Sequence, residues 1–182
     1  MKTSIVDTYE ALLQQSLAVP KLVNLASKKD NSFLNELDKW LIQTEKILEK
    51  NRFAQCSEIA GLRSKIVASK YDESINVIKK RKHKMSVATD IIYEAQATLL
   101  AVLEPIQHRI NEATEAIRQL LGVTYQADMI DYDMNFNELL QYLWTSFSTH
   151  EQLKGLTSKV LVYVNKSDAL RILAEEIDMS RS

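Results

Sequence analysis

The sequence predicts an all-α protein, a helical bundle of about six helices around one long central helix. Glycine and proline are scarce, with three glycines and two prolines in 182 residues, whereas a sheet protein of this length needs many turns rich in both. Apolar residues recur at helical spacing along most of the chain. The longest stretch without glycine or proline, between Gly61 and Pro105, also carries the most regular apolar pattern.

The first helix is predicted over residues 3–18, with Thr3 or Ser4 as its N-cap. Proline removes a backbone hydrogen bond inside a helix, so Pro20 is expected to interrupt this one before a short continuation at 21–26.

A second helix is predicted to follow a cap at Asn31 or Ser32, with Glu36 favouring its N-terminal dipole. Residues 51–57 are expected to form a loop. The second helix carries an apolar stripe that consists of Leu34, Leu37, Leu41 and Leu48.

The most informative pattern is a heptad repeat between Tyr71 and Leu120, called the seam below. Twelve of its fifteen positions are apolar. A period of 3.5 residues held this long is typical of a helix that packs along a partner helix. Ala88, Ala95 and Val102 widen the stripe, which favours a multi-helix bundle. The seam positions are Tyr71, Ile75, Ile78, Lys82, Met85, Thr89, Ile92, Gln96, Leu99, Leu103, Ile106, Ile110, Ala113, Ile117 and Leu120.

Two arrangements of residues 57–121 fit this pattern. One is a single long rod, which the continuous heptad register favours, and the other is an antiparallel helical pair that turns near Lys82 to Ser86. Pro105 lies inside the pattern without shifting the register, so a kink is expected there, with a tight restart as the alternative. Gly122 is predicted to end the helix as its C′ residue.

The last third is expected to begin with an ordered loop from Val123 to Asn135. Seven of the thirteen aromatic residues lie in residues 123–182. We therefore predict a long-helix bundle at 1–122 and a small aromatic-rich helical subdomain at 123–182 packed on it, or one single domain. Three helices are predicted, at about 136–147, 149–164 and 168–178, the last capped by Ser167.

The cellular location is predicted from three features of the chain. Cys56 is the only cysteine, which excludes an intrachain disulfide and favours a reducing compartment. The first residues lack the apolar core of a signal peptide. The densest apolar stretch, Thr98 to Leu103, is much shorter than the roughly 18 residues of a membrane span. We expect a cytoplasmic protein without a membrane span.

A basic patch between Arg63 and Lys84 is the most visible candidate site, with eight basic and two acidic residues. Such a patch can neutralise phosphates and give salt-sensitive binding of nucleic acid or acidic lipid. The other interpretation is a solvated or protein-docking face, because no Phe, Tyr or Trp that could stack on bases is interleaved in the basic run Lys79–Lys84. The residues expected to contact a polyanion are Lys79, Lys80, Arg81, Lys82 and Lys84.

Metal and catalytic signatures are incomplete. Glu104, His108 and Glu112 share one helix face, but they lie at outward heptad positions and lack the Glu-x-x-His spacing of di-iron bundles. The oxygen-bearing side chains between Asp131 and Asn137 lack the glycine and the glutamate of a calcium loop. We therefore expect no metal, no cofactor and an inert Cys56.

The leading functional hypothesis is a non-enzymatic protein-interaction protein: an adaptor, chaperone-like factor or assembly subunit. Its partner would be another protein or a second copy of the chain, since polar Thr89 and Gln96 on the seam are tolerable in a homodimer interface. The alternatives are a nucleic-acid-associated factor that uses the Arg63–Lys84 patch and an enzyme with a pocket built from scattered residues. Trp40, Trp144 and Phe147 are the candidate interface anchors, with core packing as the other interpretation.

Overall fold

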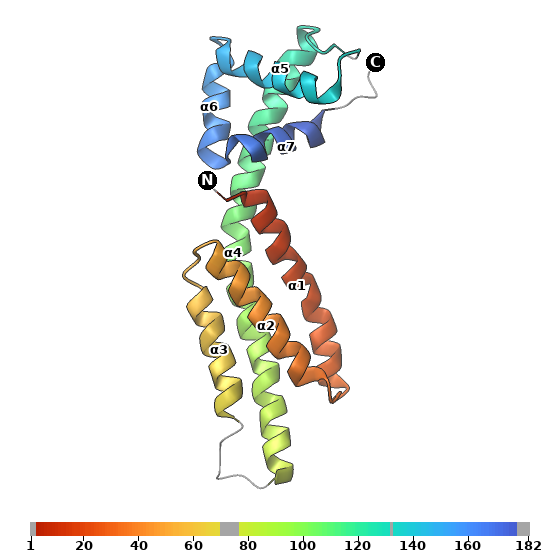
Figure 1. The fold of residues 1–182 in the computed structure, drawn as a ribbon, viewed down its shortest axis with the longest axis vertical. Helices are drawn as coiled ribbons and strands as arrows, with labels where there is room; N and C mark the ends of the chain where they lie inside the picture. The colour runs from red at the N-terminus through yellow and green to blue at the C-terminus, as the bar shows by residue number, and fades with distance from the viewer. Residues whose placement is uncertain (1–2, 70–76, 132, 178–182) are drawn as a thin grey trace. The chain divides into compact units, whose positions relative to one another are not determined.

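The computed structural model describes residues 3–69, 77–131 and 133–177. Within these ranges the chain forms seven α-helices and no strand, which confirms the all-α prediction (Figure 1). The helices are α1 (Ile5–Ser27), α2 (Phe33–Lys50), α3 (Cys56–Ala68), α4 (Val77–Gln126), α5 (Phe136–Thr149), α6 (Lys154–Tyr163) and α7 (Lys166–Glu176).

The helices form two compact units. Unit 1 consists of Met1–Asp7 and Ile106–Ser182, and unit 2 consists of Thr8–Pro105. Helix α4 contributes to both units, because its residues up to Pro105 belong to unit 2 and its remaining residues belong to unit 1. The domain boundary predicted after residue 122 falls inside α4 and inside unit 1.

The seam of α4 is covered by other helices of the same chain. Every seam position from Met85 to Leu120 is buried or half-buried, while Tyr71 and Ile75 lie outside the described residues. Ala88, Ala95 and Val102 are buried as well. The predicted multi-helix packing is therefore confirmed for this part of the helix.

Helices α3 and α4 are antiparallel neighbours in unit 2. Lys65 Nζ lies 2.8 Å from Glu94 Oε2, and Thr98 Oγ1 donates to Glu58 Oε2 at 3.1 Å. Residue numbers thus rise along α3 while they fall along α4 (Figure 1). The long central helix is confirmed by α4, whereas the single rod from residue 57 is wrong, because α3 and α4 are two antiparallel helices.

The turn predicted near Lys82 to Ser86 is also wrong, because α4 passes through these residues. They include no glycine or proline that would end a helix. Pro105 likewise lies inside α4, and the kink expected there stays a prediction.

Three helices end at non-glycine residues in the left-handed region: Lys29 (φ 53°), Arg52 (φ 58°) and Asp128 (φ 52°). After α2, the amide of Phe53 donates to the Leu48 carbonyl at 2.9 Å, the six-to-one bond of a Schellman motif. The ends of α1 and α4 make the same bond. Non-glycine residues thus take the left-handed positions that glycine usually occupies, which explains how a chain with so few glycines ends these helices.

The helix breaks predicted at Pro20 and Gly122 are both wrong. In each case the helix continues because residues that follow the predicted break are buried. Helix α1 continues through Pro20, whose neighbours Val19 and Leu22 are buried. Helix α4 continues through Gly122 for another turn. Thr124, in that turn, is fully buried, and its hydroxyl donates to the Leu120 carbonyl at 2.8 Å.

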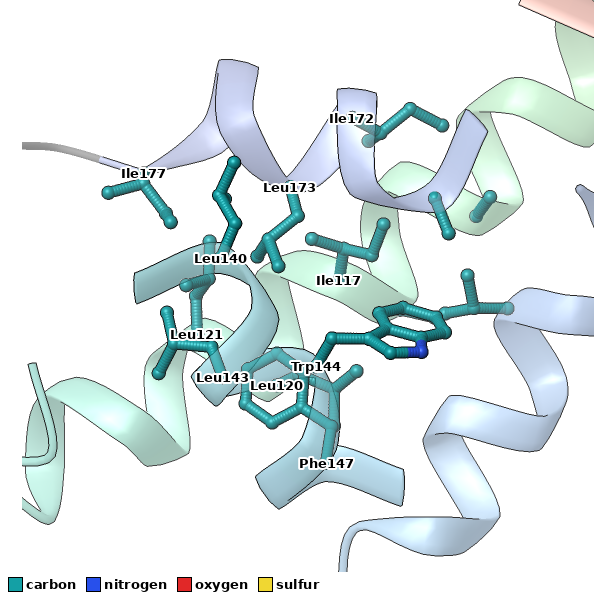
Figure 2. Packing of buried hydrophobic residues seen from close by; sticks show 14 of the residues in the cluster. Ile117, Leu120, Leu121, Leu140, Leu143, Trp144, Phe147, Ile172, Leu173 and Ile177 are labelled. Carbon is teal, nitrogen blue, oxygen red and sulfur yellow. The ribbon is translucent and has the colours of Figure 1, made fainter. Parts of the chain in front are cut away.

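The core of unit 1 lies where α5 and α7 pack on α4. Figure 2 shows Trp144 and Phe147 of α5 among Ile117 and Leu120 of α4 and Leu173 of α7. All five side chains are buried. Two aromatic residues of the C-terminal third, Trp144 and Phe147, are therefore core residues, whereas Phe136 and Tyr142 are exposed.

Asparagine side chains cap two helices of unit 1. Asn135 caps α5, and its side chain accepts from the Asn137 amide at 3.0 Å. Helix α6 begins at Lys154, later than predicted, and α7 begins at Lys166. Asn165 rather than Ser167 caps α7, because the Asn165 side chain accepts from the Asp168 amide at 2.9 Å.

The N-terminal cap of α1 is shared between two distant segments of unit 1. Ser4 Oγ accepts from the Asp7 amide at 3.0 Å, the predicted cap, and donates to Asp168 Oδ1 at 2.5 Å. The other oxygen of Asp168 accepts from the Ile5 amide at 2.8 Å. Asp168 is 2% exposed, so the start of α1 is held by a buried carboxylate from α7.

Candidate functional site

The Arg63–Lys84 basic patch is only partly within the described residues. The side chains of Lys79, Lys80, Arg81 and Lys82 lie outside them, and Lys84 is half-buried. Arg63 Nη1 lies 2.6 Å from Glu45 Oε2, and Lys65 pairs with Glu94. Two of the eight basic residues are therefore matched by carboxylates of the same unit.

The three aromatic residues considered as interface anchors are core residues. Trp40 is buried in unit 2, where its indole donates to the Gln15 carbonyl of α1 at 2.9 Å. Trp144 and Phe147 are buried in the unit 1 core (Figure 2). The structure therefore places all three as the core-packing interpretation expects.

The candidate metal residues do not gather in the described part of the chain, where no group of three or more His, Cys, Asp or Glu side chains could hold a metal ion. Glu104 and His108 are exposed, and Glu112 lies 3.5 Å from Lys159. In the acidic loop, Asp131 accepts from the Asp133 amide at 3.0 Å, an Asx turn rather than a ligand set.

The clear pKa shifts have structural causes. Arg63 donates a hydrogen bond to Glu45, which raises the pKa of Arg63, and Arg118 donates to Glu176, which raises the pKa of Arg118. Hydrogen bonds from the amide and hydroxyl of Ser32 lower the pKa of Asp30, just before α2. In each case the shift stabilises the ordinary charged form of an ion pair or a turn, which is not the shift that a general acid or base requires. Cys56 is free and half-buried.

Two surface hollows lie along α3. One has a volume of about 310 Å³ and is lined by Glu58, Lys65, Glu94 and Thr98, the residues that join α3 to α4. The other, of about 450 Å³, is lined by residues of α3 among those that the structure describes, with Arg63 beside Val67. Because Arg63 and Lys65 are paired with carboxylates, neither hollow presents a free charged group from these two residues.

The described surface also carries an apolar strip on α4 in unit 2. Tyr93 is 55% exposed and Leu100 is 50% exposed. Ala97 lies between them in the sequence and Ala101 follows Leu100, and both alanines are exposed. These four residues, the α4 outward face below, follow the i, i+4, i+7, i+8 spacing of one helix side. Tyr93 and Leu100 are about 10 Å apart along the axis. The face is opposite the buried seam residues Ile92, Ala95 and Leu99.

The charge around the α4 outward face is acidic. Asp90 and Glu104 are exposed and lie on the same helix side at its two ends, about 21 Å apart along the axis. Glu94 lies at the edge toward α3 and is paired with Lys65. Between Met85 and Pro105 the sequence contains no lysine or arginine.

The exposed apolar residues of unit 1 are arranged differently. Leu161 and Val162 of α6 are 44% and 75% exposed, but they are adjacent in sequence and point to different sides of the helix. Their neighbours one turn back are the exposed polar residues Ser158 and Lys159. Unit 1 therefore has no apolar helix side of the α4 kind on this helix.

Among the described residues, one helix is long and apolar enough to span a membrane by length and composition alone: the stretch of α4 at His83–Gln126. The core helix of a soluble protein passes the same test. The seam of this stretch is buried by other helices of the chain, and this burial accounts for most of its apolar residues.

The sequence contained a signal for the α4 outward face. With the seam at Ile92, Gln96 and Leu99, the apolar residues Tyr93 and Leu100 fall at outward heptad positions, where a solvated helix carries polar residues. Large apolar residues at outward heptad positions, and not only metal-ligand types, are therefore the sequence signal for this face.

Comparisons of the chain with protein-family models, with curated proteins and with solved structures find no match.

Proposed function

We propose that the chain is a helical protein-interaction module that binds a helix of a partner protein on the α4 outward face. The observation that carries this proposal is the exposure of Tyr93, Ala97, Leu100 and Ala101 at helical spacing. Large apolar side chains at i and i+7 are the anchors by which helices recognise one another. Exposed apolar patches with polar rims mark interaction sites more often than scattered single residues do.

Two further features support an interaction protein over the alternatives. The carboxylates paired with Arg63 and Lys65 reduce the positive charge that a nucleic-acid-binding patch would offer. The pKa shifts of Asp30, Arg63 and Arg118 favour the ordinary charge state of each group, so they give an enzyme no support. The nucleic-acid-associated factor is the second candidate, because residues 79–82 are four consecutive basic residues that could contact phosphates.

A photo-crosslinking experiment tests the proposal. Benzoylphenylalanine replaces Tyr93 in one chain and Tyr142 in another, since Tyr142 is an exposed tyrosine of unit 1 (44% exposed). The expected result is a protein adduct from position 93 only, formed in a lysate of the source cells and identified by mass spectrometry. The identified partner is then purified, and its Kd for the chain is measured directly.

Surface variants complete the test. The double variant Tyr93→Ser/Leu100→Ser is expected to weaken partner binding by at least about tenfold, because each exposed apolar anchor contributes on the order of 1 kcal/mol. The matched control is Tyr142→Ser/Leu161→Ser, which removes two apolar side chains of similar exposure from unit 1. Equal binding by both double variants, with circular dichroism showing both folded, would reject the α4 outward face as the site.

A further inference from the structure

We infer that the partner of the α4 outward face is an amphipathic helix with basic residues at both ends of its apolar stripe. This inference rests on the proposed function and adds the chemistry of the occupant. Its basis is the charge pattern of α4 in unit 2, where Asp90 and Glu104 bracket the apolar residues.

The positions of the two carboxylates determine where the partner's charges lie. Asp90 precedes Tyr93 by one turn, and Glu104 follows Leu100 by one turn. A helix that packs along this face meets a carboxylate at each end, in either chain direction. Lysine or arginine residues about fourteen positions apart, with apolar residues between them, therefore complement the face.

A second copy of the α4 outward face fits poorly. In an antiparallel pair centred on Ala97, Asp90 of one chain faces Glu104 of the other at both ends. In a parallel pair, each carboxylate faces its own copy. Like charges at these positions disfavour both self-pairings, since the sequence between Met85 and Pro105 has no basic residue that could neutralise them.

An anionic membrane surface is disfavoured by the same charges. Peripheral helices that bind such surfaces carry lysine and arginine on the polar side of the apolar stripe. The α4 outward face has Asp90 and Glu104 in that place, and its neighbour Glu94 is also acidic.

Two synthetic peptides test the inference against the full chain. Both are helical and share one apolar stripe, and they differ only at two flanking positions fourteen residues apart, which are lysine in one peptide and glutamate in the other. Fluorescence anisotropy measures binding at low and high salt. The lysine peptide is expected to bind about tenfold more tightly at low salt, with the difference falling as salt screens the exposed pairs.

The decisive experiment reverses the charge of the two carboxylates that bracket the α4 outward face. The variant Asp90→Lys/Glu104→Lys is expected to prefer the glutamate peptide. The control Glu115→Lys/Glu151→Lys changes the net charge equally at exposed residues of unit 1 and is expected to keep the lysine preference. Circular dichroism and thermal unfolding check that each variant is folded.

The outcomes separate the inference from the proposed function. If both peptides bind the chain equally and Tyr93→Ser/Leu100→Ser abolishes both, the face is a docking site and the charge inference is wrong. If the same double variant leaves peptide binding unchanged, the α4 outward face is not the site and the proposed function fails. If neither peptide binds, the inferred chemistry is wrong and the crosslinking test still decides the function. A dimer in light scattering, or capture by phosphatidylserine vesicles, that the double variant abolishes would also overturn the inferred partner.

Discussion

The two halves of α4 share one seam but differ in what they expose. In unit 1, the exposed side of the helix is bonded to its neighbours: Arg109 donates to the Tyr163 carbonyl at 2.6 Å, and Arg118 lies 2.6 Å from Glu176. In unit 2, the exposed side carries Tyr93 and Leu100. Because the seam positions from Met85 to Leu120 are buried or half-buried in both halves, the difference discussed here concerns the exposed surface of the helix.

The two halves of α4 differ in only one of two properties: which side of the helix is buried, and which residues stand at its outward positions. The period of the apolar residues determines which side of a helix is buried, and both halves of α4 obey it. The residues at outward positions are not constrained by core packing, so their chemistry reflects solvent or a partner. Variants of the seam should therefore act alike in the two units, and variants of the surface should not.

The largest expected effect is a loss in the free energy of unfolding when a buried seam residue is truncated. Leu99 in unit 2 and Leu120 in unit 1 are both fully buried. We expect Leu99→Ala and Leu120→Ala each to lower the free energy of unfolding by about 2–5 kcal/mol, because each leaves a cavity in a closely packed core. Urea denaturation of each variant measures the loss. A loss below about 1 kcal/mol for only one of them would show that the seam is not equally covered in the two halves.

The seam was also the feature most accessible from sequence. Periodicity alone predicted the seam positions from Met85 to Leu120, all of which are buried or half-buried, because a repeated apolar spacing indicates one covered helix side. Helix ends were less accessible. The usual signals at Pro20 and Gly122 were overridden by packing of later residues, such as Thr124.

The contacts that sequence could not provide are those between distant segments. Nothing near Asp168 in the sequence indicates that its carboxylate meets Ser4 and the Ile5 amide. Likewise, Lys29, Arg52 and Asp128 take the left-handed conformation that a sequence reader assigns to glycine. At these three positions the hydrogen bonds of the helix end, and not the residue type, accompany the left-handed conformation.

The second prediction concerns this distant contact in unit 1. We expect Asp168→Ala to lower the free energy of unfolding by about 1–2 kcal/mol, because it removes the acceptor for Ser4 and the Ile5 amide at the start of α1. Hydrogen exchange at the Ile5 amide should become faster. The control is Ser167→Ala at the exposed neighbouring position, where a comparable loss would mean that the start of α7, and not the shared cap, is being disturbed.

The third prediction compares helix ends in the two units. Arg52→Gly in unit 2 is expected to raise the free energy of unfolding by about 0.5–1 kcal/mol, because glycine adopts a positive φ without steric cost. Asp128→Gly in unit 1 should gain less, since aspartate tolerates this conformation better than arginine does. Thermal and urea unfolding measure both changes.

A matched control for Arg52→Gly lies two residues earlier. Lys50 is in the last turn of α2 with an exposed side chain, so Lys50→Gly should instead lower the free energy of unfolding, by up to about 1 kcal/mol. Stabilisation by both glycines would argue against backbone strain at Arg52 as the cause.

The smallest expected effects concern the exposed sides of α4 and test the comparison most directly. Leu100→Gln in unit 2 should change the free energy of unfolding by no more than about 0.5 kcal/mol, because the side chain is half exposed and leaves no core cavity. Its effect should not depend on salt. Arg118→Gln in unit 1 removes an exposed ion pair with Glu176 and should lower Tm slightly, with the loss shrinking as salt rises. Parallel thermal unfolding at low and high salt measures both variants. If Leu100→Gln destabilises the chain as strongly as Leu99→Ala, then Leu100 is a packing residue, and the surface of unit 2 does not differ from that of unit 1 in the way proposed.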